Sequence, residues 1–345
     1  MNVEDPVRSG LEAAAKLREK AASSPRHRPK LALELVGLSL ALLEKERPAE
    51  AVPVAQEVVT LLRELAQAKP ARYGLDLVGA LNVLGIAHTN AGHPAEAVPI
   101  AQEAVSRARE SAHAKPARHR SDLACVLTNL GIALAQVAPA EAVPAQREVV
   151  AIRRELAGGR PSRRQLLELS ESMNDLAGTF AKLGQAADVL EVRQELVEVW
   201  RKRARVGPAF RADPGFRFGL AMALYNLGLA LAEVGRPADA LTAEQEAEPI
   251  LRALAEDDPA GFLADHAVVC ATLGARQTQL GHATSGLPFA QEAVGHFRRL
   301  FETDPGYRPH LADALSVLGE ALEGAGRRQD AQSAKNEAGR YADEP

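Results

Sequence analysis

Apolar and polar positions alternate along this chain with the period of an α-helix. In one early segment the apolar residues Val52, Ala55, Val59, Leu62 and Ala66 recur at steps of three and four residues. Such steps place a single apolar stripe along a helix with 3.6 residues per turn. The pattern therefore predicts an amphipathic helix, which must bury its stripe against a neighbouring element.

The same segment recurs along the chain. Close copies read PAEAVPVAQEVV from Pro48, PAEAVPIAQEAV from Pro94 and PAEAVPAQREVV from Pro139, and weaker copies begin at Pro237 and Ser285. A second apolar element, such as LNVLGIAHTNAG, precedes each copy. Self-similarity at a fixed spacing is typical of helical repeat architectures.

A small residue in the first element of each repeat defines the period. These residues are Ser39, Gly85, Gly131, Ala177, Gly228, Gly274 and Gly319. The steps between them are 46, 46, 46, 51, 46 and 45 residues, so seven repeats of two helices tile the chain. A Gly such as Gly92 or Gly235 separates the two helices, where a left-handed residue can end the first one. We expect the small residue to let the paired helices approach closely.

These repeats predict an all-α fold, a right-handed α-solenoid of about seven antiparallel helix pairs with an N-terminal half-repeat helix in front. One domain would span residues 1–345, with an orphan helix in 1–26 that is either a cap or the cut end of a longer array. The expected repeats are 27–70, 71–116, 117–161, 162–204, 213–259, 260–305 and 306–345. An enlarged loop, 205–218, would either pack against the repeats or contact a ligand.

The pattern L-x-x-L-G-x-A…G…A-x-x-A resembles the tetratricopeptide repeat (TPR) family, in an extended form with a period of about 46 residues. This form is similar to the repeats of kinesin light chain and of Ala-rich actinobacterial regulatory proteins. Ala177 and Ser39 depart from the pattern, since both stand where the family has Gly. The resemblance implies a scaffold that binds a protein or peptide in a concave groove lined by the first helices.

Polar residues just before the small-residue site are the candidate contacts in that groove. They are Asn82, Asn129, Asn174, Asp175 and Asn226. An amide offers both a donor and an acceptor, so a row of them could hold the backbone of an extended peptide, as the similar Asn ladder of kinesin light chain implies. The alternative is that each Asn bonds to a neighbouring helix and fixes the repeat geometry. One turn later, the groove would also present Asn90, Gln136, Lys182 and Glu233.

The second helix of every repeat carries a glutamate at one fixed position. The set is Glu57, Glu103, Glu148, Glu195, Glu246, Glu292 and Glu337. We expect these side chains to form salt bridges or hydrogen bonds to the adjacent repeat. An acidic stripe that binds a metal ion or another cation is the alternative.

Composition narrows the choice of partner and compartment. The 345 residues carry a formal charge of −4 and only 4% aromatic residues, which argues against nucleic acid and against an anionic membrane surface. No uninterrupted apolar run approaches the roughly 20 residues of a membrane span, and the N-terminus lacks the pattern of a signal peptide. Cys125 and Cys270 are expected to be buried free thiols in a reducing compartment. We therefore expect a cytoplasmic protein, with homo-oligomers left open.

Motifs that would indicate catalysis are missing from the sequence. It contains no G-x-x-x-x-G-K-S/T phosphate loop, no G-x-S-x-G elbow and no H-E-x-x-H zinc motif. We expect no enzymatic activity, no cofactor and no metal, and a protein or peptide as the partner. The main alternative is the sensor or autoinhibitory part of a larger regulatory protein. A second alternative is a solenoid enzyme with a pocket beside residues 205–218.

Overall fold

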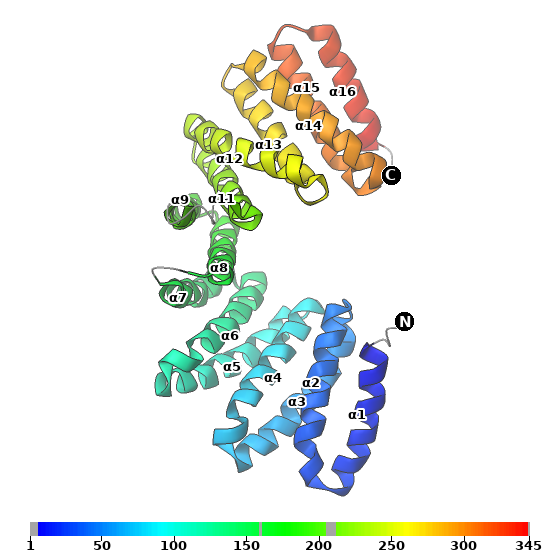
Figure 1. Ribbon diagram of the computed structural model, residues 1–345, viewed down its shortest axis with the longest axis vertical. Coiled ribbons are helices and arrows are strands. Elements are labelled where there is room, and N and C mark those ends of the chain that lie inside the picture. Colours follow the sequence, from blue (N-terminus) through cyan, green and yellow to red (C-terminus); the bar gives the residue numbers. More distant parts are fainter. Residues whose placement is uncertain (1–5, 159–160, 205–211, 344–345) are drawn as a thin grey trace. The chain divides into compact units, whose positions relative to one another are not determined.

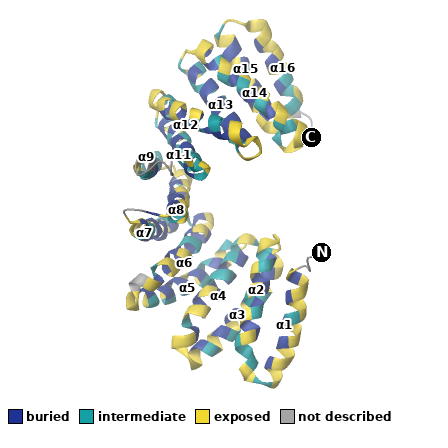
Figure 2. Ribbon diagram, in the orientation of Figure 1, coloured by how far each residue is buried: buried dark blue, intermediate teal, exposed yellow. Residues whose placement is uncertain are grey.

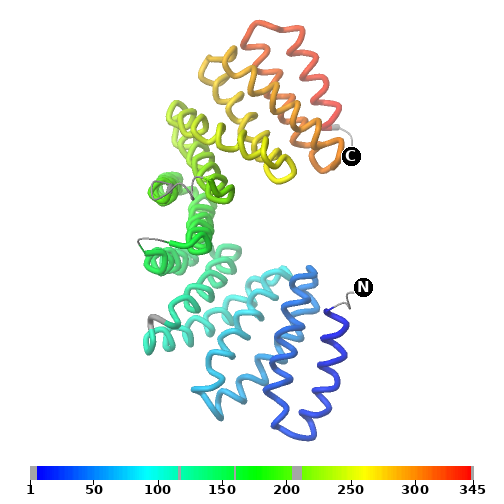
Figure 3. Tube along the Cα trace, in the orientation of Figure 1, coloured from blue at the N-terminus to red at the C-terminus, as the bar shows by residue number. Residues whose placement is uncertain are grey.

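The computed structural model describes residues 6–158, 161–204 and 212–343 (Figure 1). Within these ranges the chain forms fifteen α-helices and two short 3₁₀ helices, and no strand. The chain divides into two compact units, Met1–Gly184 and Gln185–Pro345. Each unit is built from antiparallel helix hairpins that follow one another along the trace (Figure 3).

The first unit begins with a lone helix and continues with three helix pairs and the first helix of a fourth. A 3₁₀ turn, Pro25–His27, connects the lone helix to the first pair. The helices are α1 (Pro6–Ser23), α2 (Arg28–Glu44), α3 (Pro48–Ala68), α4 (Pro70–Asn90), α5 (Pro94–Ala114), α6 (Pro116–Val137), α7 (Pro139–Ala157) and α8 (Arg163–Lys182).

The second unit begins with the second helix of that fourth repeat and contains three further pairs. Its 3₁₀ turn, Pro305–Tyr307, precedes the last pair. The helices are α9 (Ala186–Ala204), α11 (Pro214–Glu233), α12 (Pro237–Asp257), α13 (Pro259–Gln279), α14 (Ala283–Thr303), α15 (Arg308–Gly324) and α16 (Arg328–Asp343).

These bounds confirm the all-α helical repeat. Each expected repeat contains two helices, and α1 stands alone in front of them. Residues 214–218 of the expected loop belong to α11, whereas 205–211 lie outside the described residues. Phe216 and Phe218 therefore pack as helical residues, against Trp200 and Phe262 respectively. A single domain over the whole chain stays a prediction.

Helix packing follows the apolar stripes. In α3, Ala55, Val59, Leu62 and Ala66 are buried, as the sequence pattern predicts. A first helix such as α4 is buried more widely, because it packs against the second helices of its own and the preceding repeat, α5 and α3. Figure 2 shows the result as buried stripes that alternate with exposed ones along the helices.

Glycines end the first helices as expected. Gly92 and Gly235 have φ angles of 82° and 76°, in the left-handed region that Gly tolerates without a steric penalty. The first repeat has no glycine at this point, and Glu46 adopts a φ of 55° there. The turn geometry is thus the same in the first repeat, but there a residue with a side chain adopts the strained positive φ angle.

The small-residue site does allow close helix approach, although not in every repeat. A Cβ added at Gly131 would lie 2.8 Å from Cγ of Gln146. One added at Gly274 would lie 3.1 Å from the backbone nitrogen of Ala290. At Gly85, nothing lies within 4 Å of the added Cβ, so the expectation of close approach is wrong there.

One described helix, α11, is long and apolar enough to cross a membrane by length and composition. It packs against both α9 and α12. These contacts bury 39% of its most apolar window, so part of its apolar surface lies inside the helical repeat.

Candidate functional site

Two kinds of surface arise within the units from the way neighbouring repeats contact each other. First helices touch directly: α2 contacts α4, α4 contacts α6, and α6 contacts α8. Second helices of neighbouring repeats are joined by ion pairs between their arginine and glutamate side chains. We call the exposed surface of α2, α4, α6 and α8 the first-helix face.

The first-helix face carries part of the predicted Asn row. Asn129 Nδ2 donates a hydrogen bond of 2.7 Å to Asn82 Oδ1, which links α6 to α4. Asn82 Nδ2 in turn points to the sulfur of Cys125, at 3.9 Å. Both amides are half-buried. The structure therefore brings two members of the row into contact, and the bond uses only part of their donor and acceptor capacity.

The other members of the row lie on later helices. Asn174 is exposed and Asp175 is half-buried, both on α8, whereas Asn226 is half-buried on α11 in the second unit. Burial raises the pKa of the Asp175 carboxyl, and the negative charge of Glu171 adds to the shift while Arg153 opposes it. An anionic group of a ligand would therefore bind less favourably beside Asp175 than beside an Asn.

The residues expected one turn later are all exposed. Asn90, Gln136 and Lys182 lie at the ends of α4, α6 and α8, and Glu233 lies at the end of α11. Lys182 Nζ donates to the carbonyl oxygen of Ala135, at 3.2 Å. This bond connects the end of α8 to α6, so Lys182 has a structural contact of its own.

The glutamate ladder of the second helices consists of repeat-to-repeat ion pairs, as expected. Six of its members bind an arginine of the preceding second helix at 2.5–2.8 Å. The pairs are Arg18–Glu57, Arg63–Glu103, Arg109–Glu148, Arg201–Glu246, Arg252–Glu292 and Arg298–Glu337. The first pair comes from α1, which shows that the lone helix occupies the place of a second helix.

Two open grooves lie along α5, α6 and α7, on either side of the Arg109–Glu148 pair. The larger encloses about 750 Å³ and the smaller about 480 Å³. Their charged lining is largely paired, since Arg120 also binds Glu155.

The two cysteines differ in their surroundings. Cys270 is buried as expected, but Cys125 is exposed, so the prediction of two buried thiols is wrong for Cys125. The apolar pattern places both cysteines on apolar helices, but it does not show which side of a broadly apolar helix the neighbouring helices leave uncovered. Burial, together with the negative charges of Glu292 and Glu248, raises the pKa of the Cys270 thiol.

The structure also brings together a group that sequence reasoning missed. Glu248, His266, Cys270 and Glu292 converge between α12, α13 and α14. Their spacing matches no short motif, because two of the four come from other helices. An alignment of the repeats could have pointed to this group, because His266 and Cys270 stand where the other repeats have leucine or methionine.

Comparisons with known proteins agree with this architecture. A family model described as a tetratricopeptide repeat matches residues 77–112, which span most of α4 and α5. A search of curated protein sequences finds no match.

Several solved structures have a similar fold. BtubC (BKLC) from P. vanneervenii has a TM-score of 0.54 and 16% identity, and the match covers 74% of this chain and 92% of that one. A signal transduction ATPase with a tetratricopeptide repeat sensor, from Pyrococcus horikoshii, has a TM-score of 0.58 and 10% identity, with 94% of this chain and 45% of that one covered. The apo quorum sensor NprR of B. thuringiensis has a TM-score of 0.51 and 12% identity, over 98% and 83% of the two chains.

The matched repeat, the helix pairs and these neighbours agree on one conclusion. The protein has an α-solenoid fold similar to that of tetratricopeptide-repeat proteins, and its residues 77–112 match a tetratricopeptide repeat.

Proposed function

We propose that this protein is a non-enzymatic scaffold that binds an extended peptide on the first-helix face of its first unit. TPR proteins generally mediate protein–protein interactions. The observation that carries the proposal is the Asn82–Asn129 pair, whose amides stand half-buried on this face with hydrogen-bonding capacity to spare.

Side chains beside the pair support a peptide ligand. Along α6, Cys125, Asn129, Ile132 and Gln136 follow at steps of four, three and four residues, so they share one side of the helix. Ile132 is 37% exposed although it is large and apolar. A polar group between apolar neighbours suits an extended peptide, whose backbone needs partners and whose side chains need pockets.

Exposed apolar residues favour the first helices in general. Eight large apolar side chains are exposed in the described part of the chain, and seven of them lie on first helices. These seven are Leu33, Leu40, Leu75, Ile132, Val137, Leu167 and Leu229. Apolar groups that gather on one kind of surface mark an interaction site more often than scattered ones do.

The proposal can be tested with peptides selected against the immobilised chain from a displayed random library. Binding of a selected, labelled peptide is then measured by fluorescence anisotropy. Asn82→Ala together with Asn129→Ala should abolish binding while the melting temperature barely changes. Asn336→Ala, on α16 and outside the row, is the matched control and should bind like the wild type.

A structural role of the row would give the opposite result. The double variant would melt at a clearly lower temperature and still bind the peptide. In that case the Asn82–Asn129 bond serves only to fix the spacing of α4 and α6.

A sensor module is the second candidate, because two of the similar structures are described as a quorum sensor and as an ATPase with a TPR sensor. In that role the chain would regulate an effector domain when a ligand binds. A change in hydrodynamic radius on addition of the selected peptide would support this function, and an unchanged radius would favour a passive scaffold.

The compartment and the class of partner are part of the same proposal. A net charge of −4 and the scarcity of aromatic residues favour a protein partner over nucleic acid. The buried free thiol of Cys270 and the exposed one of Cys125 suit the reducing cytoplasm.

A further inference from the structure

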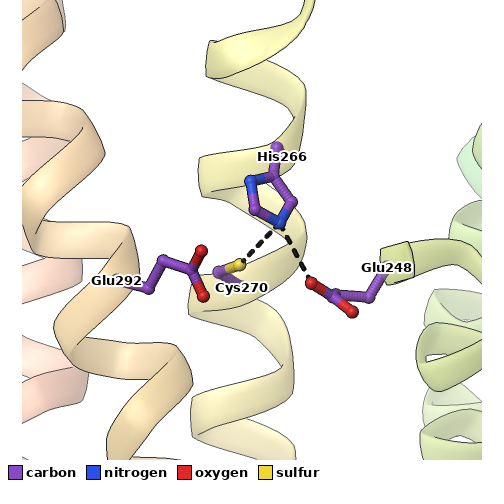
Figure 4. A group of neighbouring side chains, drawn as sticks. All are labelled: Glu248, His266, Cys270 and Glu292. Carbon is purple, nitrogen blue, oxygen red and sulfur yellow. Dashed lines mark hydrogen bonds and ion pairs between the residues drawn. The ribbon is translucent and has the colours of Figure 1, made fainter. Parts of the chain in front are cut away.

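Four side chains with metal-binding atoms meet in the second unit. They are Glu248 on α12, His266 and Cys270 on α13, and Glu292 on α14 (Figure 4). One ligand atom from each lies within 4.8 Å of the other three. His266 Nε2 is 3.1 Å from Glu248 Oε1 and 3.3 Å from Cys270 Sγ. A single ring nitrogen thus faces both a carboxylate and a sulfur.

Three of the four residues depart from the repeat at core positions. Counted from Gly274, His266 occupies the site held by Leu31, Leu77, Leu123, Leu169, Leu220 and Leu311 in the other repeats. Cys270 occupies the site of Leu35, Leu81, Leu127, Met173, Leu224 and Leu315. Glu248 takes the site of Val59, Val105, Val150, Val197, Val294 and Gly339.

The three residues that depart from the repeat lie together in the structure, and all three are polar or ionisable. The equivalent residues are aliphatic almost throughout and mostly buried, and His266, Cys270 and Glu248 remain buried. Polar or ionisable groups in a core reduce stability unless each finds a partner. Three separate replacements of aliphatic residues occur at sites that contact one another. This indicates that the three polar groups are each other's partners.

The net charge of the surrounding side chains favours a bound cation. Arg252 binds both carboxylates, with its Nε 2.8 Å from Glu248 Oε1 and its two terminal nitrogens each 2.8 Å from a Glu292 oxygen. Two carboxylates and one guanidinium leave one net negative charge when His266 and Cys270 are neutral. A divalent cation bound to a Cys270 thiolate would bring the sum to zero.

His296 borders the cluster on the remaining side. Its Nε2 is buried and lacks a well-formed hydrogen bond, and it stands 3.5 Å from Glu292 Oε1. Its ring centroid is 5.1 Å from that of His266. A cation held by Glu292 would therefore have a second imidazole close by.

We propose that Glu248, His266, Cys270 and Glu292 form a structural zinc site that clamps α12, α13 and α14 together. Zinc accepts sulfur, nitrogen and oxygen ligands at about 2.0–2.3 Å in a tetrahedron, which places neighbouring ligand atoms about 3.3–3.6 Å apart. The His266 distances to Glu248 and Cys270 approach these values. The ligand atoms of the whole group lie within 4.8 Å of one another, so closing the site requires small inward movements of the side chains.

The donor set favours zinc over other common ions. A thiolate and an imidazole are poor ligands for magnesium or calcium, which prefer oxygen alone. Four protein ligands leave no open position for water or substrate, so the site is of the structural and not the catalytic kind. Binding would release the thiol proton of Cys270 to solvent, because the ligand is the thiolate.

Titration of the full, tag-free chain tests the site, after EDTA treatment and dialysis. The probes are Co²⁺, whose tetrahedral thiolate complexes absorb in the visible and near ultraviolet, and Zn²⁺, which should displace it. We expect one Co²⁺ per chain with a thiolate-to-cobalt band. Zn²⁺ should also raise the melting temperature, since a ligand that binds only the folded state stabilises it.

Matched variants separate this site from adventitious binding. Cys270→Ser should lose the thiolate band and weaken Zn²⁺ binding at least tenfold. Cys125→Ser makes the same chemical change at the exposed cysteine and should behave like the wild type. Glu292→Gln should keep the thiolate band but bind Zn²⁺ at least tenfold more weakly.

A repeat-restoring variant covers the case in which Cys270→Ser fails to fold. Glu248→Val with His266→Leu and Cys270→Leu restores the residues of the other repeats, so it should fold and show no response to Zn²⁺. The proposal is overturned if the metal-free wild type binds no stoichiometric Co²⁺. It is equally overturned if Cys270→Ser, or the restored variant, responds to Zn²⁺ as the wild type does. The cluster would then be a buried polar network closed by Arg252 alone.

Discussion

The layer between the first and second repeats and the layer between the fifth and sixth use the same backbone positions for opposite chemistry. In the first unit, Val59 of α3 and Leu77 and Leu81 of α4 are buried in one apolar cluster. In the second unit, the equivalent positions hold Glu248, His266 and Cys270.

Outside the buried layer the two places remain alike. Arg63 binds Glu103 in the first unit as Arg252 binds Glu292 in the second. The repeat thus sets the helix pairing and the surface ion pair, while the buried layer can change its chemistry without loss of the fold. What distinguishes the two layers is how they are stabilised: one by apolar burial, the other by contacts among polar groups.

The largest expected effect comes from truncation of the apolar layer. Leu81→Ala should lower the free energy of unfolding by about 2–5 kcal/mol, because the fully buried side chain leaves a cavity. Cys270→Ala should cost less than about 2 kcal/mol in metal-free buffer, since it removes a single heavy atom. Urea unfolding followed by circular dichroism measures both. Equal losses would show that the polar layer is packed and stabilised like the apolar one.

A smaller effect separates two glycines at the same position of the repeat. Gly274→Ala should destabilise the protein by about 1–3 kcal/mol, because its Cβ would meet the backbone of Ala290. Gly85→Ala should stabilise it by up to about 1 kcal/mol, because Ala favours a helix and the space is open. Melting temperatures of the two variants decide the sign. A shared sign would mean that the two helix pairs are equally close.

The junctions between paired helices should differ by a similar or smaller amount. Glu46→Gly should raise the free energy of unfolding by about 1 kcal/mol, because a side chain at positive φ is strained there. Gly235→Ala should lower it by about the same amount, for the same reason. Paired denaturation curves test both variants. A destabilised Glu46→Gly would indicate that the Glu46 side chain contributes a contact worth more than the strain.

The smallest effect concerns the shared ion pairs. Double-mutant cycles on Arg63–Glu103 and Arg252–Glu292 should give coupling energies of about 0.2–1 kcal/mol, because these side chains are partly exposed. The second pair should lie at the upper end, since Arg252 also binds the more deeply buried Glu248.

Acidification should remove the Arg63–Glu103 contribution. Burial opposes ionisation of Glu103, but the guanidiniums of Arg63 and Arg107 outweigh it and lower the pKa of this carboxyl. A lowered folded-state pKa stabilises the protein above the usual glutamate range, and this stability is lost as the pH falls through the folded pKa. The coupling energy measured at neutral pH should therefore fade in acid, and a coupling that persists there would contradict the assignment.

The repeat made most of the fold predictable. Seven copies of one pattern placed the helix pairs, the lone helix α1 and the left-handed glycines, because helix period and turn chemistry are local properties of the chain. The glutamate ladder was predictable for a related reason: a charge at the same place in every copy meets the same neighbour in every copy. The sequence indicated the Asn row too, with a bond to a neighbouring helix as one alternative, but not that the partner of Asn129 would be Asn82.

By itself, then, the sequence determined what repeats: the pairing of helices, their order and the surface ion pairs. Only the tertiary structure decided what does not repeat. Burial separated Cys125 from Cys270, since neighbouring helices cover one and not the other. Convergence of Glu248, His266, Cys270 and Glu292 required three helices to be placed side by side. Such a site depends on distances between segments far apart in the chain, which no local pattern encodes.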